Sequence, residues 1–394
     1  MSKFDSVLLI AGGGIGGLAT ALALARRGFA SHVFEKRTVF STEGAGIQIG
    51  PNGGHVLALL GLREALRSKA GIPHAVRVHD GRSGGVLCRI PLGDHIARRY
   101  GAPYWVFHRG DLHAALLDAA RDCPLITLSS GAEVTGLSQG ADTVCAETAD
   151  GSRLEGAGLV SADGLWSGLR SQFFGERRLV FSNRSAARAV LRIEDVPSGI
   201  SSSDVGLWLS DKAHVVHYPV RGGSELALVV VRHDESSAPG WSADVLPMWV
   251  REGVRSFAPV LQDLVSAVSD WRKWGLYDLP EPPAFVNGRV ALLGDAAHPV
   301  LPFLAQGGVM ALEDGFVLAQ CVAAHEDVSA AFSAYQFARR QRVLRVQGAS
   351  RKNGRIYHLQ GALATARNLT LKAAPPGMLL SQYDWLYGWH PDEG

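Results

Sequence analysis

Hydrophobic residues near the start of the chain form two blocks on either side of a cluster of glycines. The run from Ser6 to Ile10 predicts a strand, and the Ala- and Leu-rich segment from Leu18 to Arg27 predicts a helix that Gly28 ends. His32 to Glu35 predicts a second strand. Strand, helix and strand within about 30 residues make up a βαβ unit.

The turn between the first strand and the helix carries the spacing Gly-x-Gly-x-x-Gly. Gly12 permits the tight turn, Gly14 lets a pyrophosphate approach the backbone, and Gly17 lets helix and strand pack closely. Glu35 follows Gly12 by 23 residues, where a carboxylate can accept hydrogen bonds from ribose hydroxyls. The predicted dinucleotide-binding residues of this unit are Gly12, Gly14, Ile15, Gly17, Glu35 and Lys36. The motif alone does not distinguish NAD from FAD.

A second glycine-containing turn lies far downstream. Arg289 to Asp295 reads as a buried strand that ends in Gly-Asp, and a helix is expected from Val309 to Ala324. An aspartate at the carboxyl end of a strand can bind the hydroxyls of a polyol such as ribityl. Gly307 and Gly308 at the helix start can present N–H groups to the electron-rich edge of a flavin ring.

The region from about 179 to 282 has a different pattern, with short β-like runs separated by polar turns. These runs are residues 189–193, 206–209, 214–218 and 226–231, and they predict an antiparallel sheet in a second domain. Strand alternation places His214, Val216 and Tyr218 on one face of that sheet.

Composition narrows the functional class. The chain has 394 residues, 47% hydrophobic and 19% charged, which is typical of a globular protein of two or three domains. A net charge of +2 gives no reason to expect nucleic acid or a membrane as partner. The four cysteines form no CxxC pair, so no metal site is predicted and a reducing compartment, the cytoplasm, is expected.

One segment imitates a membrane span or a signal peptide. Residues 6–25 carry no charge, but five glycines fall within the six positions from Gly12 to Gly17. Each glycine costs a helix about 1 kcal/mol relative to alanine, so both interpretations are rejected.

Three motifs in order resemble those of the single-component FAD-dependent aromatic hydroxylases, the class A monooxygenases. They are Gly-x-Gly-x-x-Gly, then Asp163-Gly-x-x-Ser-x-x-Arg170, then Gly294-Asp-Ala-Ala-His-Pro with Ala305-Gln-Gly307. The segments 44–52, 104–112, 335–339 and 385–389 are also similar to the branch that contains salicylate, 3-hydroxybenzoate and hydroxynicotinate hydroxylases. The matches extend over nearly the whole chain.

The resemblance implies FAD as the bound cofactor and NADH or NADPH as a transient electron donor, since there is no second nucleotide motif. Asp163 and Arg170 would belong to a motif that serves both FAD and the donor. The further cofactor-binding residues that it implies are Ala45, Gln48, Arg109, Val134, Asp163, Asp295, Gly307, Gly308 and Val309.

For the substrate side, the branch places a His and a Tyr four residues apart against the aromatic ring. His214 is therefore expected to be the catalytic base that takes the proton of a phenol, with Tyr218 and Tyr104 orienting the ring. Many relatives carry a polar residue between Pro299 and Ala305, whereas this loop is apolar, so we expect Pro302 and Phe303 to contact the substrate.

The expected fold is α/β, with a Rossmann-like FAD-binding domain, an antiparallel substrate domain and C-terminal helices. The predicted limits are 1–72, 102–178 and 283–340 for the first domain, 73–101 and 179–282 for the second, and 341–394 for the helical segment. The resemblance implies that a small aromatic substrate reacts with O2 through a C4a-hydroperoxyflavin, and that the protein is a homodimer.

Other functions remain open from the sequence. A related flavoprotein monooxygenase would carry out epoxidation or decarboxylative hydroxylation, and a halogenase is disfavoured because only Trp271-x-x-Trp274 resembles its tryptophan motif. An NAD-dependent dehydrogenase without flavin would leave the Gly294-Asp295 motif unexplained. A protein that binds FAD without catalysis would consume no NAD(P)H.

Overall fold

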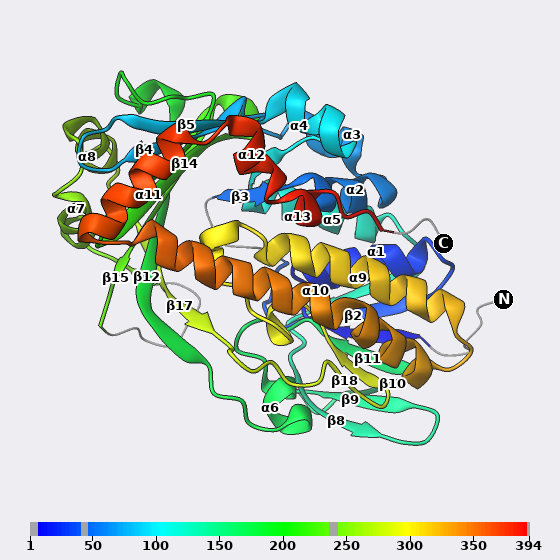
Figure 1. Ribbon diagram of the computed structural model, residues 1–394. Coiled ribbons are helices and arrows are strands. Elements are labelled where there is room, and N and C mark those ends of the chain that lie inside the picture. The colour runs from blue at the N-terminus through cyan, green and yellow to red at the C-terminus, as the bar shows by residue number, and fades with distance from the viewer. Residues whose placement is uncertain (1–6, 41–45, 236–242, 392–394) are drawn as a thin grey trace.

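The structure, a computed structural model, describes residues 7–40, 46–235 and 243–391. Within these ranges the chain forms two large sheets with helices packed around them (Figure 1). One sheet carries the first glycine turn, and the other carries His214.

The first sheet has six strands within the described residues. Their order is β18 (Val286–Asn287), β19 (Val290–Leu292), β11 (Gly158–Ser161), β1 (Leu8–Ala11), β2 (Ser31–Glu35) and β7 (Ile126–Ser130). All neighbours are parallel except β18 and β19. In a parallel sheet the carboxyl ends of the strands meet at one edge, so the turns after β1, β2, β11 and β19 gather there.

The second sheet has eight strands in the part of the chain that the structure covers. Their order is β16 (Ala243–Asp244), β17 (Arg272–Asp278), β12 (Val180–Arg192), β15 (Glu225–His233), β14 (Ala213–Val220), β13 (Val205–Leu209), β4 (Ala75–Asp80) and β5 (Val86–Pro91). It is antiparallel apart from the pair β13 and β4. All eight strands fall within 73–101 and 179–282, the ranges predicted for the substrate domain.

Two small sheets complete the strands seen in the described segments. They are β10 (Arg153–Gly156), β9 (Val144–Thr148) and β8 (Val134–Gln139) in one, and β3 (Gly46–Ile49) with β6 (Trp105–His108) in the other.

Helices surround both sheets. They are α1 (Ile15–Ala25), α2 (Pro51–Leu59), α3 (Arg63–Arg67), α4 (Gly93–Tyr100), α5 (Arg109–Arg121), α6 (Gly168–Phe174), α7 (Pro247–Val254), α8 (Pro259–Ser266), α9 (Gly307–Ala324), α10 (Val328–Tyr357), α11 (Gly361–Ala373), α12 (Pro376–Ser381) and α13 (Asp384–Tyr387). Two short 3₁₀ turns, η3 (Gly294–Ala296) and η4 (Pro302–Leu304), lie between β19 and α9.

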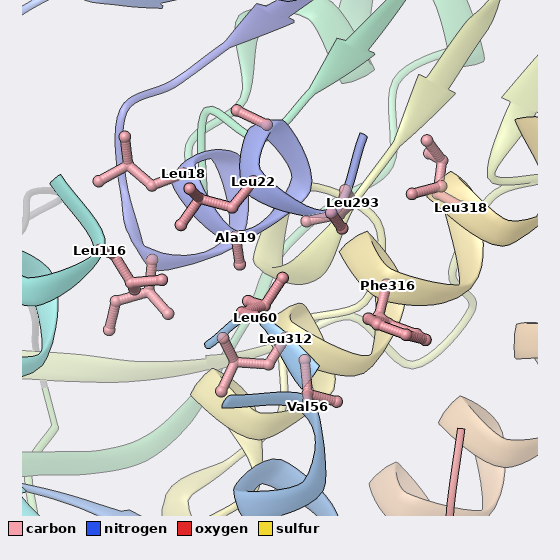
Figure 2. Packing of buried hydrophobic residues seen from close by; sticks show 14 of the residues in the cluster. Leu18, Ala19, Leu22, Val56, Leu60, Leu116, Leu293, Leu312, Phe316 and Leu318 are labelled. Carbon is pink, nitrogen blue, oxygen red and sulfur yellow. The ribbon is translucent and has the colours of Figure 1, made fainter. Parts of the chain in front are cut away.

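The largest hydrophobic core lies where α1, α2, α5 and α9 meet the six-stranded sheet. Figure 2 shows Leu18 and Leu22 of α1 facing Leu312 of α9, with Val56 of α2 close by. This packing fixes the starts of α1 and α9 relative to each other, and both starts carry predicted cofactor glycines. Among the described helices, α9 is long and apolar enough to cross a membrane, yet over half of it is buried inside the protein.

The predicted elements are found with small shifts in their ends. The strand and helix of the βαβ unit are β1 and α1, and the helix predicted from Val309 begins two residues earlier. The boundary predicted at residue 340 falls inside α10, a continuous helix of 30 residues that lies along α9 (Figure 1). The other domain limits stay predictions.

Candidate functional site

A cavity of about 1040 Å3 extends from the carboxyl edge of the six-stranded sheet to the face of the eight-stranded sheet. This volume is at the upper end of the roughly 300–1,000 Å3 that is usual for small-molecule sites. Its lining includes most of the predicted cofactor residues: Gly12, Gly14, Ile15, Glu35, Lys36, Gln48, Arg109, Val134, Asp163, Asp295, Gly307 and Gly308.

The three glycines of the first turn occupy three different environments. Gly12 has φ +112°, and a Cβ there would overlap the carbonyl oxygen of Ala162. A Cβ on Gly17 would overlap the carbonyl oxygen of Gly12, so Gly17 serves packing and does not line the cavity. Nothing lies within 4 Å of the position that a Cβ on Gly14 would take. Since Gly14 begins α1 without a side-chain cap, its open side fits a pyrophosphate.

Glu35 ends β2 at the rim of the cavity. One carboxylate oxygen accepts a hydrogen bond from the N–H of Gly13, and the other accepts one from the N–H of Arg37, both at 3.0 Å. Each oxygen has a second lone pair, so the carboxylate, held in place by the backbone, can still accept from a ribose.

Asp295 lies in η3 and faces the cavity. Burial raises the pKa of its carboxyl group, while His298, Arg109 and Arg170 act in the opposite direction. Arg170 itself is only 3% exposed and does not line the cavity. It donates hydrogen bonds to the carbonyl oxygens of Ala296 and Leu165, at 2.9 and 2.7 Å. Arg170 therefore joins the second and third motifs and does not reach the cofactor space.

The start of α9 closes the cavity from another side. Nothing lies within 4 Å of a Cβ position on Gly307, and the N-cap residue Gln306 offers no capping side chain. The first N–H groups of α9 are thus available to an electron-rich ring edge. Val309 is fully buried in the core and does not line the cavity, and Ala45 lies outside the described residues.

These observations fit FAD. An open backbone turn, a carboxylate at the end of β2, a second carboxylate in η3 and a free helix start follow one another along a single cavity. No cluster of three or more metal-ligating side chains occurs among the described residues.

The face of the eight-stranded sheet forms the other wall. His214, Val216 and Tyr218 of β14 point into the cavity, whereas Val215 belongs to the core on the opposite face. Burial raises the pKa of Tyr218 to about 12, against the effect of Arg188. Tyr218 is therefore a neutral hydrogen-bonding group. Tyr104 does not line the cavity; its hydroxyl donates to Oε1 of Gln48 at 2.6 Å, and Gln48 faces the cavity.

His214 has a partner that no sequence signal indicated. Its Nδ1 lies 3.1 Å from Nε2 of His358, and Nδ1 of His358 lies 2.7 Å from the carbonyl oxygen of Gly354. A carbonyl only accepts, so Nδ1 of His358 carries the proton and its Nε2 is an acceptor. His214 then donates from Nδ1, which leaves its Nε2 without a proton. This tautomer is the one that a base requires.

The loop before α9 differs from the prediction. Pro302 lines the cavity, but Phe303 does not. The Phe303 ring packs behind the wall against His214, with 5.5 Å between ring centroids, and against Tyr357. Phe303 therefore supports the histidine, because η4 turns its side chain away from the cavity.

Arg188 and Trp274 were missed by sequence reasoning. Both line the cavity, and the Arg188 guanidinium carbon lies 3.9 Å from the centroid of the Trp274 ring. The predicted strand began at Ala189, one residue too late, while β12 starts at Val180. A single arginine between alanines and a valine in a buried strand is the signal that could have found it.

Comparison with known proteins agrees with the geometry. Residues 5–350 match the FAD binding domain family. The 3-hydroxybenzoate 6-hydroxylase of Polaromonas naphthalenivorans is 35% identical over 387 residues, which cover 98% of this chain and 96% of that protein. The 6-hydroxynicotinate 3-monooxygenase of Pseudomonas fluorescens is 33% identical, with 88% of this chain and 90% of that protein covered.

A solved structure has the same fold. Klebsiella pneumoniae HpxO complexed with FAD aligns with a TM-score of 0.86 and 26% identity, covering 97% of this chain and 98% of that one. The FAD-binding match excludes the alternative of an NAD-dependent dehydrogenase without flavin. The chain belongs to the FAD-binding family and is an FAD-dependent aromatic monooxygenase of the single-component type.

Proposed function

We propose that this enzyme hydroxylates a small aromatic ring that carries a phenolic hydroxyl, and that His214 is the base for that hydroxyl. The unprotonated Nε2 of His214 in the wall of the cavity carries the proposal. The names of the relatives support it, since 3-hydroxybenzoate, 6-hydroxynicotinate and 3-amino-4-hydroxybenzoate each have a ring hydroxyl.

The chain's own residues divide the work. Gly14, Glu35 and Asp295 would hold FAD, which supplies electrons from NAD(P)H to O2 when it is bound. The valines of the wall exclude water from the ring. His214 accepts or shares the phenol proton, which enriches the ring in electrons for attack by electrophilic oxygen. Tyr218 donates or accepts a hydrogen bond that orients the ring.

The pKa of His214 is consistent with this role. Burial, His358 and Arg184 all lower it well below 6.5. The imidazole is therefore neutral at physiological pH and able to accept a proton. The phenol must be brought close to it, because a base with a lowered pKa removes a proton fully only when the product anion is stabilised by its surroundings.

The test uses the purified holoenzyme. Reduction of its flavin by NADH and by NADPH is followed with hydroxybenzoates, hydroxypyridine carboxylates and aminohydroxybenzoates, and products are identified after O2 is added. We expect one ring class to be hydroxylated, and His214→Ala to lower kcat by about 100-fold or more with FAD content unchanged. Unchanged kcat would remove His214 from the role of base.

The same experiment separates the related chemistries. Release of CO2 would indicate decarboxylative hydroxylation, and an epoxide product would contradict the proposal. A homodimer, a cytoplasmic location and the lack of nucleic-acid or membrane partners stay predictions. Light scattering on the purified enzyme tests the first of them.

A further inference from the structure

Arg188 is a buried cation without an acidic partner. Among the described residues, none forms an ion pair with it, and its Nε has no hydrogen-bond acceptor. Its one recorded contact of charge is with the face of Trp274. A buried charge that is not paired is costly, and natural proteins rarely retain one without a ligand or function to match it.

The position of Arg188 in the sheet places it beside the predicted substrate space. On the cavity face, Val216 of β14 is in register with Val229 of β15, and Val229 is in register with Arg188 of β12. Two strand spacings of about 4.8 Å separate Arg188 from Val216. His214 lies one step along β14 from Val216 on the same face. An aromatic ring against these valines would thus have the base near one end and a guanidinium near the other.

The charge of Arg188 is maintained despite its burial. Burial lowers the pKa to about 10, with Tyr218 acting against this and Arg109 adding to it. The group is therefore fully protonated at pH 7, and the end of the cavity opposite the base carries a full positive charge. The neighbouring wall residues Val190, Val229 and Leu276 are apolar and cannot neutralise it.

We propose that Arg188 binds the carboxylate of an aromatic acid and thereby selects anionic rings as substrates. The planar guanidinium can donate two parallel hydrogen bonds to a carboxylate while it stays stacked on Trp274. The proposal rests on the proposed function, since it assumes that the ring bound beside His214 is the substrate.

Binding to the oxidised holoenzyme tests this without turnover. Perturbation of the flavin spectrum gives Kd for 3-hydroxybenzoate and 6-hydroxynicotinate and for the two corresponding neutral amides. We expect Arg188→Met to weaken the binding of at least one acid by about 10- to 100-fold and to leave its amide within about threefold. Arg188→Lys should recover only part of the loss, because an ammonium group cannot form the planar, stacked pair.

Arg192→Met is the matched control. Arg192 lies on the same strand, is 70% exposed and pairs with Glu194 on the surface, so its removal should change neither affinity. Equal losses for acid and amide in Arg188→Met would show a packing role and overturn the proposal. It would also be overturned by wild-type enzyme that binds amides as tightly as acids, or by an effect on the KM of NAD(P)H alone.

The two proposals fail in different ways. If Arg188 discriminates acids from amides but no ring is hydroxylated, the anion site stands and the proposed function fails. If hydroxylation proceeds and the acid-to-amide ratio ignores Arg188, the proposed function stands and this inference fails.

Discussion

The chemistry of His214 depends on His358, which does not touch the cavity. His358 fixes the tautomer of His214 and also lowers its pKa. Protonation removes the base, so the kcat/KM of the wild-type enzyme should fall only as the pH drops through a value well below 6.5. The acid limb of the pH profile measures that value.

His358→Phe should change both properties. Without the His358 charge the pKa of His214 rises, which moves the acid limb to higher pH, and without the acceptor the tautomer is no longer fixed. We expect kcat to fall about tenfold with little change in KM. His358→Gln, which keeps an acceptor, should recover part of kcat. An acid limb that does not move in either variant would contradict this coupling.

Individual side chains were predictable from sequence only where periodicity governs them. Alternation along a strand placed His214 and Tyr218 on the cavity face, as found. The His358 contact spans 144 residues and has no periodic signal. Phe303 and Val309 follow residues that line the cavity, yet both point elsewhere, because a 3₁₀ turn and the first turn of a helix set the side-chain direction.

The turn between β1 and α1 allows two glycines to be separated by experiment. Gly14→Ala adds a methyl group to open space, so we expect a folded protein whose FAD content or FAD affinity is reduced. Gly17→Ala places a methyl group on the carbonyl oxygen of Gly12, so we expect little soluble protein. Absorbance of bound flavin and yield of soluble protein measure the two effects.

Gly348→Ala is the control for both substitutions. Gly348 lies inside α10 with nothing near its Cβ position and away from the cavity, so alanine should be neutral or slightly stabilising. Full FAD content in Gly14→Ala would mean that the pyrophosphate does not approach this residue.

Helices α9 and α10 are joined by buried charges. Arg339 is 1% exposed and pairs with Glu313 and Asp314, each at 2.7 Å. Asp314 also accepts a hydrogen bond from His298 at 2.6 Å, which fixes the loop after η3. His298 therefore has a structural place in this network, in agreement with the sequence reading that gave it no catalytic role.

Removal of Arg339 leaves two buried carboxylates without compensation. We expect Arg339→Met to reduce the free energy of unfolding by about 3–5 kcal/mol. Lys352→Met, at an exposed position of the same helix, should change it by less than about 0.5 kcal/mol. Denaturant unfolding of the two variants measures the difference, and equal stabilities would show that the network is not needed.

The fold as a unit should lose stability in mild acid. Burial lowers the pKa of His217 to about 3 and that of His358 to about 4. Between these values and 6.5 the unfolded chain binds protons that the folded chain does not, so stability falls as the pH decreases. The two histidines together account for about 4 kcal/mol between pH 6.5 and pH 5.

Thermal unfolding between pH 7 and pH 5 measures this loss. His217→Leu should reduce the slope, because Nδ1 of His217 has no hydrogen-bond partner and its removal leaves no acceptor or donor unsatisfied. A melting temperature that is constant over this range would show that the histidines are hydrated in the folded protein.

The general architecture was predictable because each sheet has its own sequence signature, with glycine turns after parallel strands and polar turns between antiparallel ones. The boundary at residue 340 was not, since α10 has no break in its helical pattern between Val328 and Tyr357. A compositional change marks a domain limit only when the chain also changes direction there.

The continuity of α10 has a consequence for how the active site can vary. At about 1.5 Å per residue its 30 residues form a rod of about 45 Å, anchored at Arg339 and delivering His358 at its far end. The loss of one residue between these two points would rotate His358 by about 100° around the helix axis. Substitutions along the rod are tolerated by this geometry, whereas insertions and deletions are not. The spacing between Arg339 and His358 is thus a length standard, and it ties the protonation of the base to the depth at which the cofactor half of the protein is packed.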